Sequence, residues 1–188
     1  MKTLILVRHC KAEGQEESAL LTQEGQQQAI DLMTHLLNLN FKIDKIISSP
    51  YERAVKTIKP FAEEVGLEIH TDERLSERRL SNAPITNWLD ILKHTFDDID
   101  FSVEGGESTR EATERAITLI KEQMHSEKQI TLMVTHGNLM TLILKHFDER
   151  FGFKEWANLT NPDIYKITIQ EENSTVTRLW DTTISNSI

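Results

Sequence analysis

The sequence predicts an α/β protein: a three-layer α/β/α sandwich with a mostly parallel central sheet, helices on both faces and antiparallel strands near the C-terminus. Short apolar runs alternate with longer amphipathic stretches, which is the pattern of strands connected by helices. Of the 188 residues, 38% are hydrophobic and 27% are charged, which suits a folded globular core. No internal repeat, low-complexity tract or Pro/Gly-rich linker divides the sequence, so we expect one domain over residues 1–188.

Strands and helices are expected to alternate in the first half of the chain. The expected strands are residues 3–7, 43–47 and 67–70, and the expected helices are residues 22–39 and 49–65. Thr22 has the character of an N-cap for the first helix. Ser49 and Pro50 have the character of an N-cap and a first helical residue for the second, which Gly66 is expected to stop.

The second half of the chain continues this alternation after a polar stretch, residues 71–83, that predicts no regular element. Helices are expected over residues 85–96, 108–124 and 138–147, a buried strand over 130–134, and a Gly-containing loop over 104–107. Ser108 and Glu111 have the spacing of a capping box. Two alternating runs between residues 164 and 180 predict an antiparallel hairpin that turns around residues 171–174.

The charge balance and the cysteine count exclude several classes of protein. The chain has 21 Lys and Arg against 30 Asp and Glu, a net charge of −9, which argues against a general nucleic-acid or anionic-membrane partner. No apolar run approaches the roughly 18–20 residues that span a bilayer, and the run at residues 4–7 is too short for a signal peptide. Cys10 is the only cysteine, which excludes an internal disulfide framework and a multi-cysteine zinc site. We expect a cytoplasmic protein, and the sequence leaves its oligomeric state open.

Three of the predicted buried strands end in polar residues. Arg8 and His9 follow the first strand, Arg53 lies one helical turn beyond the second, and His136 follows the strand at 130–134. In open α/β sheets the ligand crevice lies outside the carboxyl ends of the strands. If these strands are neighbours, two guanidiniums and two imidazoles converge at one edge of an acidic protein, which indicates a site for an anion.

Phosphate is the anion that fits such a cluster best. Planar guanidinium groups match pairs of phosphate oxygens. Helices that start near Ser49 and Gly137 would add backbone N–H donors to the same edge.

Five short motifs in order resemble those of the histidine phosphatase superfamily, which includes cofactor-dependent phosphoglycerate mutases and many small phosphatases. Any one of these motifs is weak, but five in the right order over residues 4–138 are specific. The motifs are Leu6–His9, Leu21–Ala29, Ser48–Thr57, Glu104–Ser108 and Thr135–Asn138.

The resemblance implies a role for each residue of the cluster. His9 would be the nucleophile that forms a phosphohistidine, while Arg8, Arg53 and His136 would hold the phosphoryl oxygens. Glu77 falls where the family places its general acid, which protonates the leaving alkoxide and then activates water. The resemblance demands no metal or organic cofactor.

The resemblance also implies substrate contacts, and the sequence departs from the family pattern at several of these positions. Gln15, Gly137 and Asn138 would bind the substrate, Gln15 in place of a frequent Asn. Cys10 replaces the usual Gly after the nucleophile, so the backbone there must accept a side chain. Ala12 stands where a hydroxyl residue is common.

The segment after Glu77 lacks the Gly and Trp-Glu-Gly pattern often found in the family. Arg78 and Arg79 in this segment are either contacts for an anionic substrate or, as we expect, a solvated charge pair. The resemblance therefore predicts the core chemistry better than it predicts the substrate pocket.

Two other kinds of site fit these residues less well than a phosphatase site does. A cysteine phosphatase based on Cys10 is rejected because Glu13 and Glu16 would occupy its phosphate loop. A zinc site from His9, His136 and Glu77 would leave both arginines without a role.

Within the family, the short span between residues 57 and 135 favours hydrolysis over mutase activity. We expect a phosphomonoesterase for small phosphorylated metabolites. 2,3-Bisphosphoglycerate-dependent phosphoglycerate mutase activity and a non-catalytic phosphate-binding module of the same fold are the alternatives.

Overall fold

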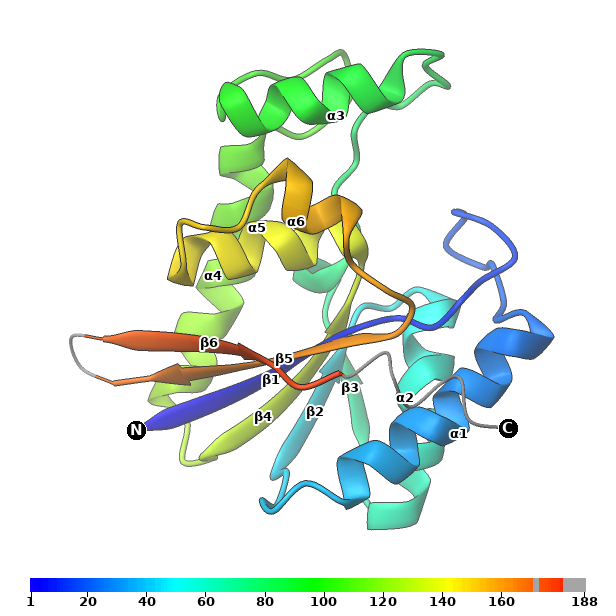
Figure 1. Ribbon diagram of the computed structural model, residues 1–188, viewed down its shortest axis with the longest axis vertical. Coiled ribbons are helices and arrows are strands. Elements are labelled where there is room, and N and C mark those ends of the chain that lie inside the picture. The colour runs from blue at the N-terminus through cyan, green and yellow to red at the C-terminus, as the bar shows by residue number, and fades with distance from the viewer. Residues whose placement is uncertain (171–172, 181–188) are drawn as a thin grey trace.

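The computed structural model describes residues 1–170 and 173–180, which form a six-stranded sheet packed between helices (Figure 1). The strands are β1 (Lys2–Arg8), β2 (Lys45–Ser48), β3 (Ile69–Thr71), β4 (Ile130–Thr135), β5 (Asp163–Ile169) and β6 (Ser174–Arg178). The helices are α1 (Gln23–Leu37), α2 (Glu52–Val65), α3 (Trp88–Asp97), α4 (Thr109–His125), α5 (Gly137–Phe147) and α6 (Phe153–Ala157), with a 3₁₀ turn at Glu73–Leu75.

The sheet is parallel in its centre and antiparallel at one end, which confirms the predicted fold class. The strand order is β3-β2-β4-β1-β5-β6. Strands β3, β2, β4 and β1 pair in parallel, and β5 and β6 add antiparallel strands beside β1. The predicted hairpin is present in β5 and β6, and two of its predicted turn residues, 171 and 172, lie outside the described residues.

Alternating side chains of the central strands pack on opposite faces of the sheet, because successive residues of a strand point to opposite sides. Leu4 and Leu6 of β1 belong to a core built with α4 and α5. Ile5 and Val7 belong to a second core, built with α1 and α2. Figure 1 shows the two pairs of helices on either side of the sheet, with α3 stacked beyond α5 and α6. This arrangement leaves the carboxyl ends of β1, β2 and β4 together at one edge.

Local capping largely follows the sequence, with one correction. Thr22 caps α1 through a bond from the N–H of Gly25, and Ser108 caps α4 in a capping box with Glu111. Gly66 ends α2 in the left-handed conformation, with φ of 69°. The prediction that Ser49 caps α2 is wrong.

Ser49 still belongs to the sheet edge, where its N–H bonds to Val134, and the helix begins only at Glu52. Pro50 therefore lies in the turn before α2 and is not its first helical residue. Tyr51 holds the N-cap position, without a side-chain cap.

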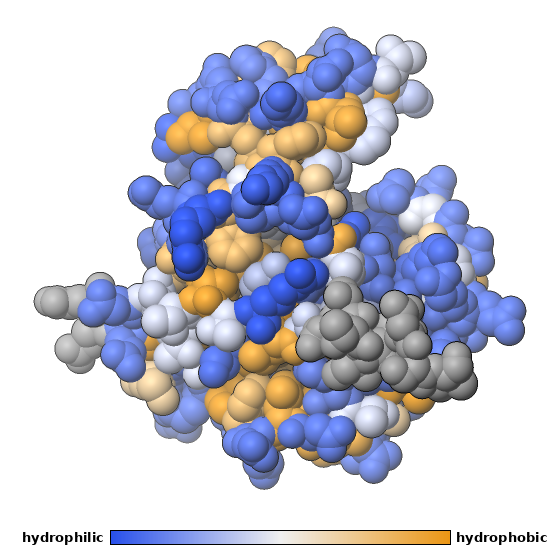
Figure 2. All heavy atoms as spheres, viewed as in Figure 1, coloured by the Kyte–Doolittle hydropathy of each residue, from blue (hydrophilic) through white to orange (hydrophobic). Residues whose placement is uncertain are grey.

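The region between β3 and α4 carries the least regular structure and the largest differences from prediction. Strand β3 lies slightly later than predicted, and α3 starts at Trp88 rather than at residue 85. Helix α6 was not predicted; it begins after Gly152, whose N–H donates to the side chain of Glu155 at 3.0 Å. Trp88 and Leu89 are exposed, and Figure 2 shows apolar side chains among polar ones over α3. In the described residues, no helix combines the length and the apolarity needed to cross a membrane.

Candidate active site

The three strands that were predicted to be neighbours, β1, β2 and β4, are adjacent in the sheet, and the polar residues that follow them lie together. Strand β4 lies between β1 and β2, with Arg8 paired to Thr135 and Ser48 paired to Val134. The N–H of His9 continues the ladder with a bond of 3.0 Å to the carbonyl of Thr135. The residues that follow the three strands therefore share one edge, as the sequence predicted.

His9 is buried and has one nitrogen committed to the backbone. Its Nδ1 lies 2.7 Å from the carbonyl oxygen of Cys10, which can only accept, so Nδ1 carries the proton and Nε2 carries the lone pair. Burial, together with the positive charges of Arg53 and Arg8, lowers the pKa of His9 to about 3. The ring is therefore neutral at neutral pH, with Nε2 available as a nucleophile.

Arg53 is almost fully buried, with 1% of its surface exposed. Its Nε lies 3.3 Å from Nε2 of His9, and one terminal nitrogen donates to the carbonyls of Gln15 and Glu16 at 3.1 and 2.7 Å. Thr57, one turn later, donates its hydroxyl to the Arg53 carbonyl and accepts the N–H of Cys10. These bonds tie the loop after β1 to the first turn of α2.

Arg8 approaches the same place from β1. One terminal nitrogen donates to the carbonyls of Leu159 and Thr160 at 3.1 and 3.3 Å, while its buried Nε has no partner in the part of the chain that the structure describes. Burial lowers the pKa of Arg8 and of Arg53, opposed by the negative charge of Glu77, and both stay cationic. Among the ion pairs of residues 1–170 and 173–180, none includes Arg8 or Arg53. One buried and one partly buried cation without a paired carboxylate form a site for an anion.

His136 completes the cluster and is fully buried. Its ring meets those of His9 and Tyr51 edge to face, with centroids 5.0 and 4.8 Å away. Its Nε2 lies 2.8 Å from the hydroxyl oxygen of Ser49, and its Nδ1 has no partner among the described residues. The guanidinium of Arg53 lies over the ring of Tyr51, 4.9 Å from its centroid.

Glu77 lies at the same edge, fixed at the start of α5. One carboxylate oxygen accepts the N–H groups of Leu139 and Arg78 at 2.9 and 2.8 Å, and the other accepts that of Asn138 at 3.0 Å. Glu77 thus occupies backbone donors of α5 that the sequence analysis assigned to phosphate. A carboxylate is favourable there because a helix N-terminus carries partial positive charge.

Of the three predicted substrate contacts, Gly137 and Asn138 are buried and Gln15 is exposed. An ideal Cβ on Gly137 would lie 3.1 Å from the guanidinium of Arg8, so glycine allows their close approach. Asn138 is buried, and neither polar atom of its side chain has a partner in the described residues. Gln15 is exposed, and its backbone carbonyl binds Arg53.

This cluster occurs in a chain that matches a known protein family over most of its length. The family model of the histidine phosphatase superfamily, branch 1, matches residues 4–182. The chain belongs to this superfamily. It is therefore an enzyme of the histidine phosphatase type, as the motifs predicted.

Several relatives of this histidine phosphatase are known. A curated protein from Hydrogenobacter thermophilus, provisionally named phosphoserine phosphatase 2, is 28% identical over 196 aligned positions that cover 95% of both chains. A mycobacterial glucosyl-3-phosphoglycerate phosphatase, solved as a complex with VO3, has a TM-score of 0.76 at 20% identity over 95% of this chain and 98% of that one. An Entamoeba histolytica phosphoserine phosphatase mutant in complex with phosphoserine has a TM-score of 0.70 at 22% identity over 94% and 95% of the two chains. The two solved structures share the fold.

The expectation of a solvated charge pair at Arg78 and Arg79 of this histidine phosphatase is wrong for Arg78 and holds for the exposed Arg79. Arg78 is not a solvated charge or a free substrate contact, because it is buried and donates to the carbonyl of Glu107 and the hydroxyls of Thr95 and Thr109. Arg79 is exposed, but its Nε donates to the carbonyl of Gly105 at 2.7 Å. Both arginines thus fasten the segment after Glu77 to the loop before α4.

Cys10 fits where the family prefers glycine. No non-glycine residue in the described part of the chain has a positive φ, so the backbone at this position accepts a side chain without strain. The thiol is fully buried in the core beneath α1 and α2, and this burial raises the pKa of Cys10 to about 12. A thiol held protonated at neutral pH is no nucleophile.

Sequence reasoning missed several residues that position the cluster. Asn161 donates its side-chain amide to the carbonyl of His9 at 2.7 Å from the far end of the chain, which no local pattern signals. Arg115 donates to the carbonyls of Arg74 and Ser76 and pairs with Glu107, and so holds the turn before Glu77. Tyr51 could have been noticed from its place between β2 and Arg53, whereas Ser49 was predicted there only as a helix cap.

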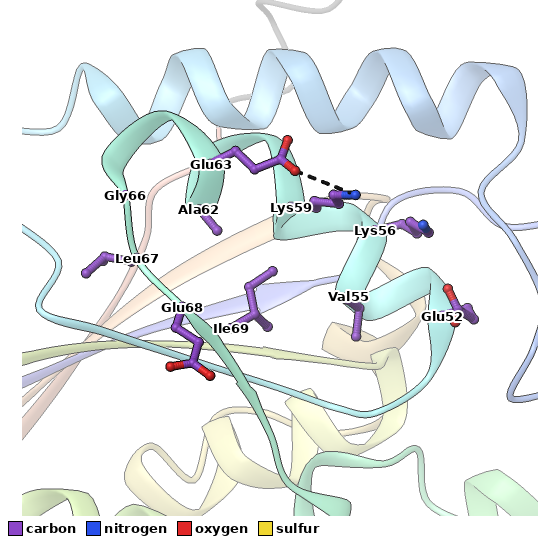
Figure 3. Close-up of a pocket in the computed structure, with 10 residues that line it drawn as sticks. All are labelled: Glu52, Val55, Lys56, Lys59, Ala62, Glu63, Gly66, Leu67, Glu68 and Ile69. Carbon is purple, nitrogen blue, oxygen red and sulfur yellow. Dashed lines mark ion pairs between the residues drawn. The ribbon is translucent and has the colours of Figure 1, made fainter.

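Metal ligands and a hollow outside the cluster are two other features that could mark a site. In the described residues, no three His, Cys, Asp or Glu side chains gather in the arrangement of metal ligands. An open pocket with a volume of about 640 Å³ lies between α2 and β3 (Figure 3). Lys59 and Glu63 pair along α2 on one side of it at 3.6 Å, and none of its lining residues belongs to the cluster (Figure 3).

Proposed function

We propose that this protein is a phosphomonoesterase for small metabolites that works through a phosphohistidine on His9. The observation that carries the proposal is a neutral imidazole whose Nε2 lies 3.3 Å from the buried guanidinium of Arg53, with the partly buried Arg8 close enough for its charge to act on the same ring. Neither arginine has a carboxylate partner among the ion pairs of the described residues. A phosphoryl group between them would meet a nucleophile on one side and positive charge around its oxygens.

The first step transfers the phosphoryl group to the enzyme. The Nε2 lone pair of His9 forms a bond to phosphorus while the bond from phosphorus to the ester oxygen breaks. The guanidiniums and His136 stabilise the charge on the non-bridging oxygens. The ester oxygen leaves as an alcohol with a proton supplied by Glu77.

The second step returns the enzyme to its starting state. Water attacks phosphorus, the bond to Nε2 breaks, and Glu77 takes a proton from the water, so one ester and one water become alcohol and inorganic phosphate. The geometry of the carboxyl group supports this role, because the oxygen that accepts only the N–H of Asn138 keeps a position that can carry the proton for the leaving group and then take one back from water. The three backbone bonds hold that oxygen at the edge of the cluster.

Small phosphorylated metabolites are the substrate class that the relatives support. The names of two relatives specify phosphoserine phosphatases and that of a third specifies a glucosyl-3-phosphoglycerate phosphatase. We also propose a reducing, cytoplasmic setting, supported by a single cysteine that is buried as a thiol.

A phosphate-release screen over phosphorylated metabolites, starting with phosphoserine and phosphoglycerates, tests the activity. The wild type should hydrolyse at least one of these esters, and H9A should lose that turnover. A rapidly quenched reaction should contain phosphoprotein that is stable in base and labile in acid, as a phosphohistidine is. Unchanged turnover in H9A would refute the nucleophile, and faster isomerisation of 3-phosphoglycerate than phosphate release would make the enzyme a mutase.

The role of Glu77 is tested separately with leaving groups of different basicity. E77Q should slow alkyl phosphates by about 10²-fold or more and slow p-nitrophenyl phosphate far less, because p-nitrophenolate leaves without a proton. E73Q is a matched control, since Glu73 lies exposed on the adjacent 3₁₀ turn. An equal loss on both substrates in E77Q would show that Glu77 is not the acid.

A further inference from the structure

Ser49 lies in the centre of the site although the proposed reaction gives it no role. Its side chain is fully buried at the end of β2, and its N–H is used by the sheet in a 2.9 Å bond to Val134. Its hydroxyl oxygen has two neighbours: Nε2 of His136 at 2.8 Å and the backbone nitrogen of Tyr51 at 3.3 Å. The hydroxyl therefore connects the turn before α2 to the imidazole.

The direction of these two bonds follows from what each group can do. The N–H of Tyr51 can only donate, so the Ser49 oxygen accepts there. The hydroxyl hydrogen has one acceptor among its contacts, Nε2 of His136. A buried hydroxyl normally donates its hydrogen, so Nε2 is the bare nitrogen of the ring.

The opposite assignment leaves more groups unsatisfied. If Nε2 carried the proton, both the Ser49 hydrogen and the lone pair on Nδ1 of His136 would be buried without a partner among residues 1–170 and 173–180. With the proton on Nδ1, that N–H donor is the one group of the pair left without a partner there, and the positive charges of Arg53 and Arg8 act on the same ring. A phosphoryl oxygen, which only accepts, satisfies that donor and would be repelled by a lone pair.

The ring of His136 is neutral, so it carries a single proton, on either Nδ1 or Nε2. Burial first, followed by the charges of His9 and Arg53, lowers the pKa of His136 well below its ordinary value. The rings of His9 and Tyr51 contact it edge to face at interplanar angles of 61° and 63°, which restricts rotation that would exchange its nitrogens.

We propose that Ser49 is a positioning residue that holds His136 as its Nδ1–H tautomer, so that this N–H donates to a non-bridging oxygen of the phosphoryl group. The catalytic part of this inference rests on the proposed function, whereas the tautomer itself does not. Tyr51 supports the arrangement through its backbone N–H and its ring. A proton on the wrong nitrogen would remove one of the donors that stabilise the transferring group.

The test compares S49A with S48A. Ser48 is the matched control because it is equally buried and its hydroxyl donates to a backbone carbonyl, that of Ser49. S49A should lower kcat by about 10-fold to 10²-fold, as loss of an aligned transition-state donor does, and S48A should stay within about twofold of wild type. S49T, which keeps the hydroxyl, should recover most of the activity.

Nitrogen NMR of the histidine side chains gives a readout that a loss of packing would not imitate. In the wild type, His136 should show a proton-bearing Nδ1 and a bare Nε2, and inorganic phosphate should shift the Nδ1 signal. In S49A the bare nitrogen should become Nδ1, or both nitrogens should show averaged signals. Thermal unfolding checks that each variant is folded.

The two proposals fail in different ways. A wild-type His136 with its proton on Nε2 would overturn the tautomer inference, whatever the activity. An unaltered tautomer in folded S49A would overturn it equally. If no phosphate is released from any ester while the tautomer changes as expected, the proposed function fails and the role of Ser49 in setting the tautomer stands.

Discussion

Nε of Arg53 lies 3.3 Å from Nε2 of His9, so a buried cation faces the nitrogen that we propose attacks phosphorus. The contact has two consequences. The guanidinium disfavours protonation of the ring, which keeps Nε2 without a proton. Nε2 is also the acceptor of the Arg53 Nε–H, so a bound phosphoryl oxygen could replace it as the acceptor and release the lone pair for attack.

Replacing Arg53 with lysine should damage catalysis despite the conserved charge. The guanidinium binds two backbone carbonyls and His9 at once, whereas an ammonium is a point donor without that planar geometry. R53K should therefore lower kcat/KM for phosphate release by about 10²-fold to 10³-fold. R110K is the control, because Arg110 is exposed and pairs with Asp100 on the surface. R53K within threefold of wild type would show that charge alone suffices.

A methyl group at Gly137 should displace Arg8. The added Cβ would lie 3.1 Å from the guanidinium, which cannot yield easily because it is held by the carbonyls of Leu159 and Thr160. We expect G137A to lower kcat/KM by about tenfold, since small misplacements of binding groups cost rate. In G152A the nearest atom is 3.7 Å away, an ordinary contact, so this variant should retain wild-type activity. Equal activities would mean that Arg8 tolerates the shift.

The sequence was sufficient for the sheet centre and the four cationic or imidazole residues, because both depend on local patterns. Buried parallel strands appear as apolar runs, and their ends meet at one edge once the strands are neighbours. Arg8, His9, Arg53 and His136 each stand at or just beyond such an end. Their convergence therefore follows from topology.

Other parts of the site depend on contacts that no local pattern encodes. Arg78 looked like a surface charge, and only the packing of α3 and α4 around it provides its hydroxyl partners. Ser49 looked like a helix cap, and its hydroxyl is instead bound by His136, far away in sequence. Glu77 was predicted at the site, but its bonds to the start of α5 are likewise tertiary contacts.

Acid should destabilise the protein partly through His9. Its pKa is about 3 in the folded protein against an ordinary value of 6.5, so between these values the unfolded chain binds a proton that the folded protein rejects. The contribution of His9 to the free energy of unfolding is complete above about pH 6.5 and is lost as pH falls towards 3. The slope in that window should approach 1.4 kcal/mol per pH unit at most, as an order of magnitude.

Urea unfolding of wild type and H9N at a series of pH values measures this effect. The free energy of unfolding should fall less steeply with decreasing pH in H9N, because asparagine does not titrate. H125N, which replaces an exposed histidine of α4, should keep the wild-type slope. Parallel curves for H9N and wild type would contradict a depressed pKa of His9.

Arg115 should affect the reaction through Glu77 rather than through the phosphoryl group. It donates to the carbonyls of Arg74 and Ser76 at 2.7 and 3.0 Å and pairs with Glu107, so it fixes the turn from which Glu77 projects. R115Q should slow alkyl phosphates by about tenfold and p-nitrophenyl phosphate by less than about threefold, a weaker form of the E77Q pattern. Steady-state rates on both substrates measure the difference.

R150Q is the control for this prediction, because it removes a largely exposed arginine paired with Asp148 and should change neither rate. An equal loss on both substrates in R115Q would place its effect on the phosphate site or on folding, because a misplaced acid matters only when the leaving group needs a proton.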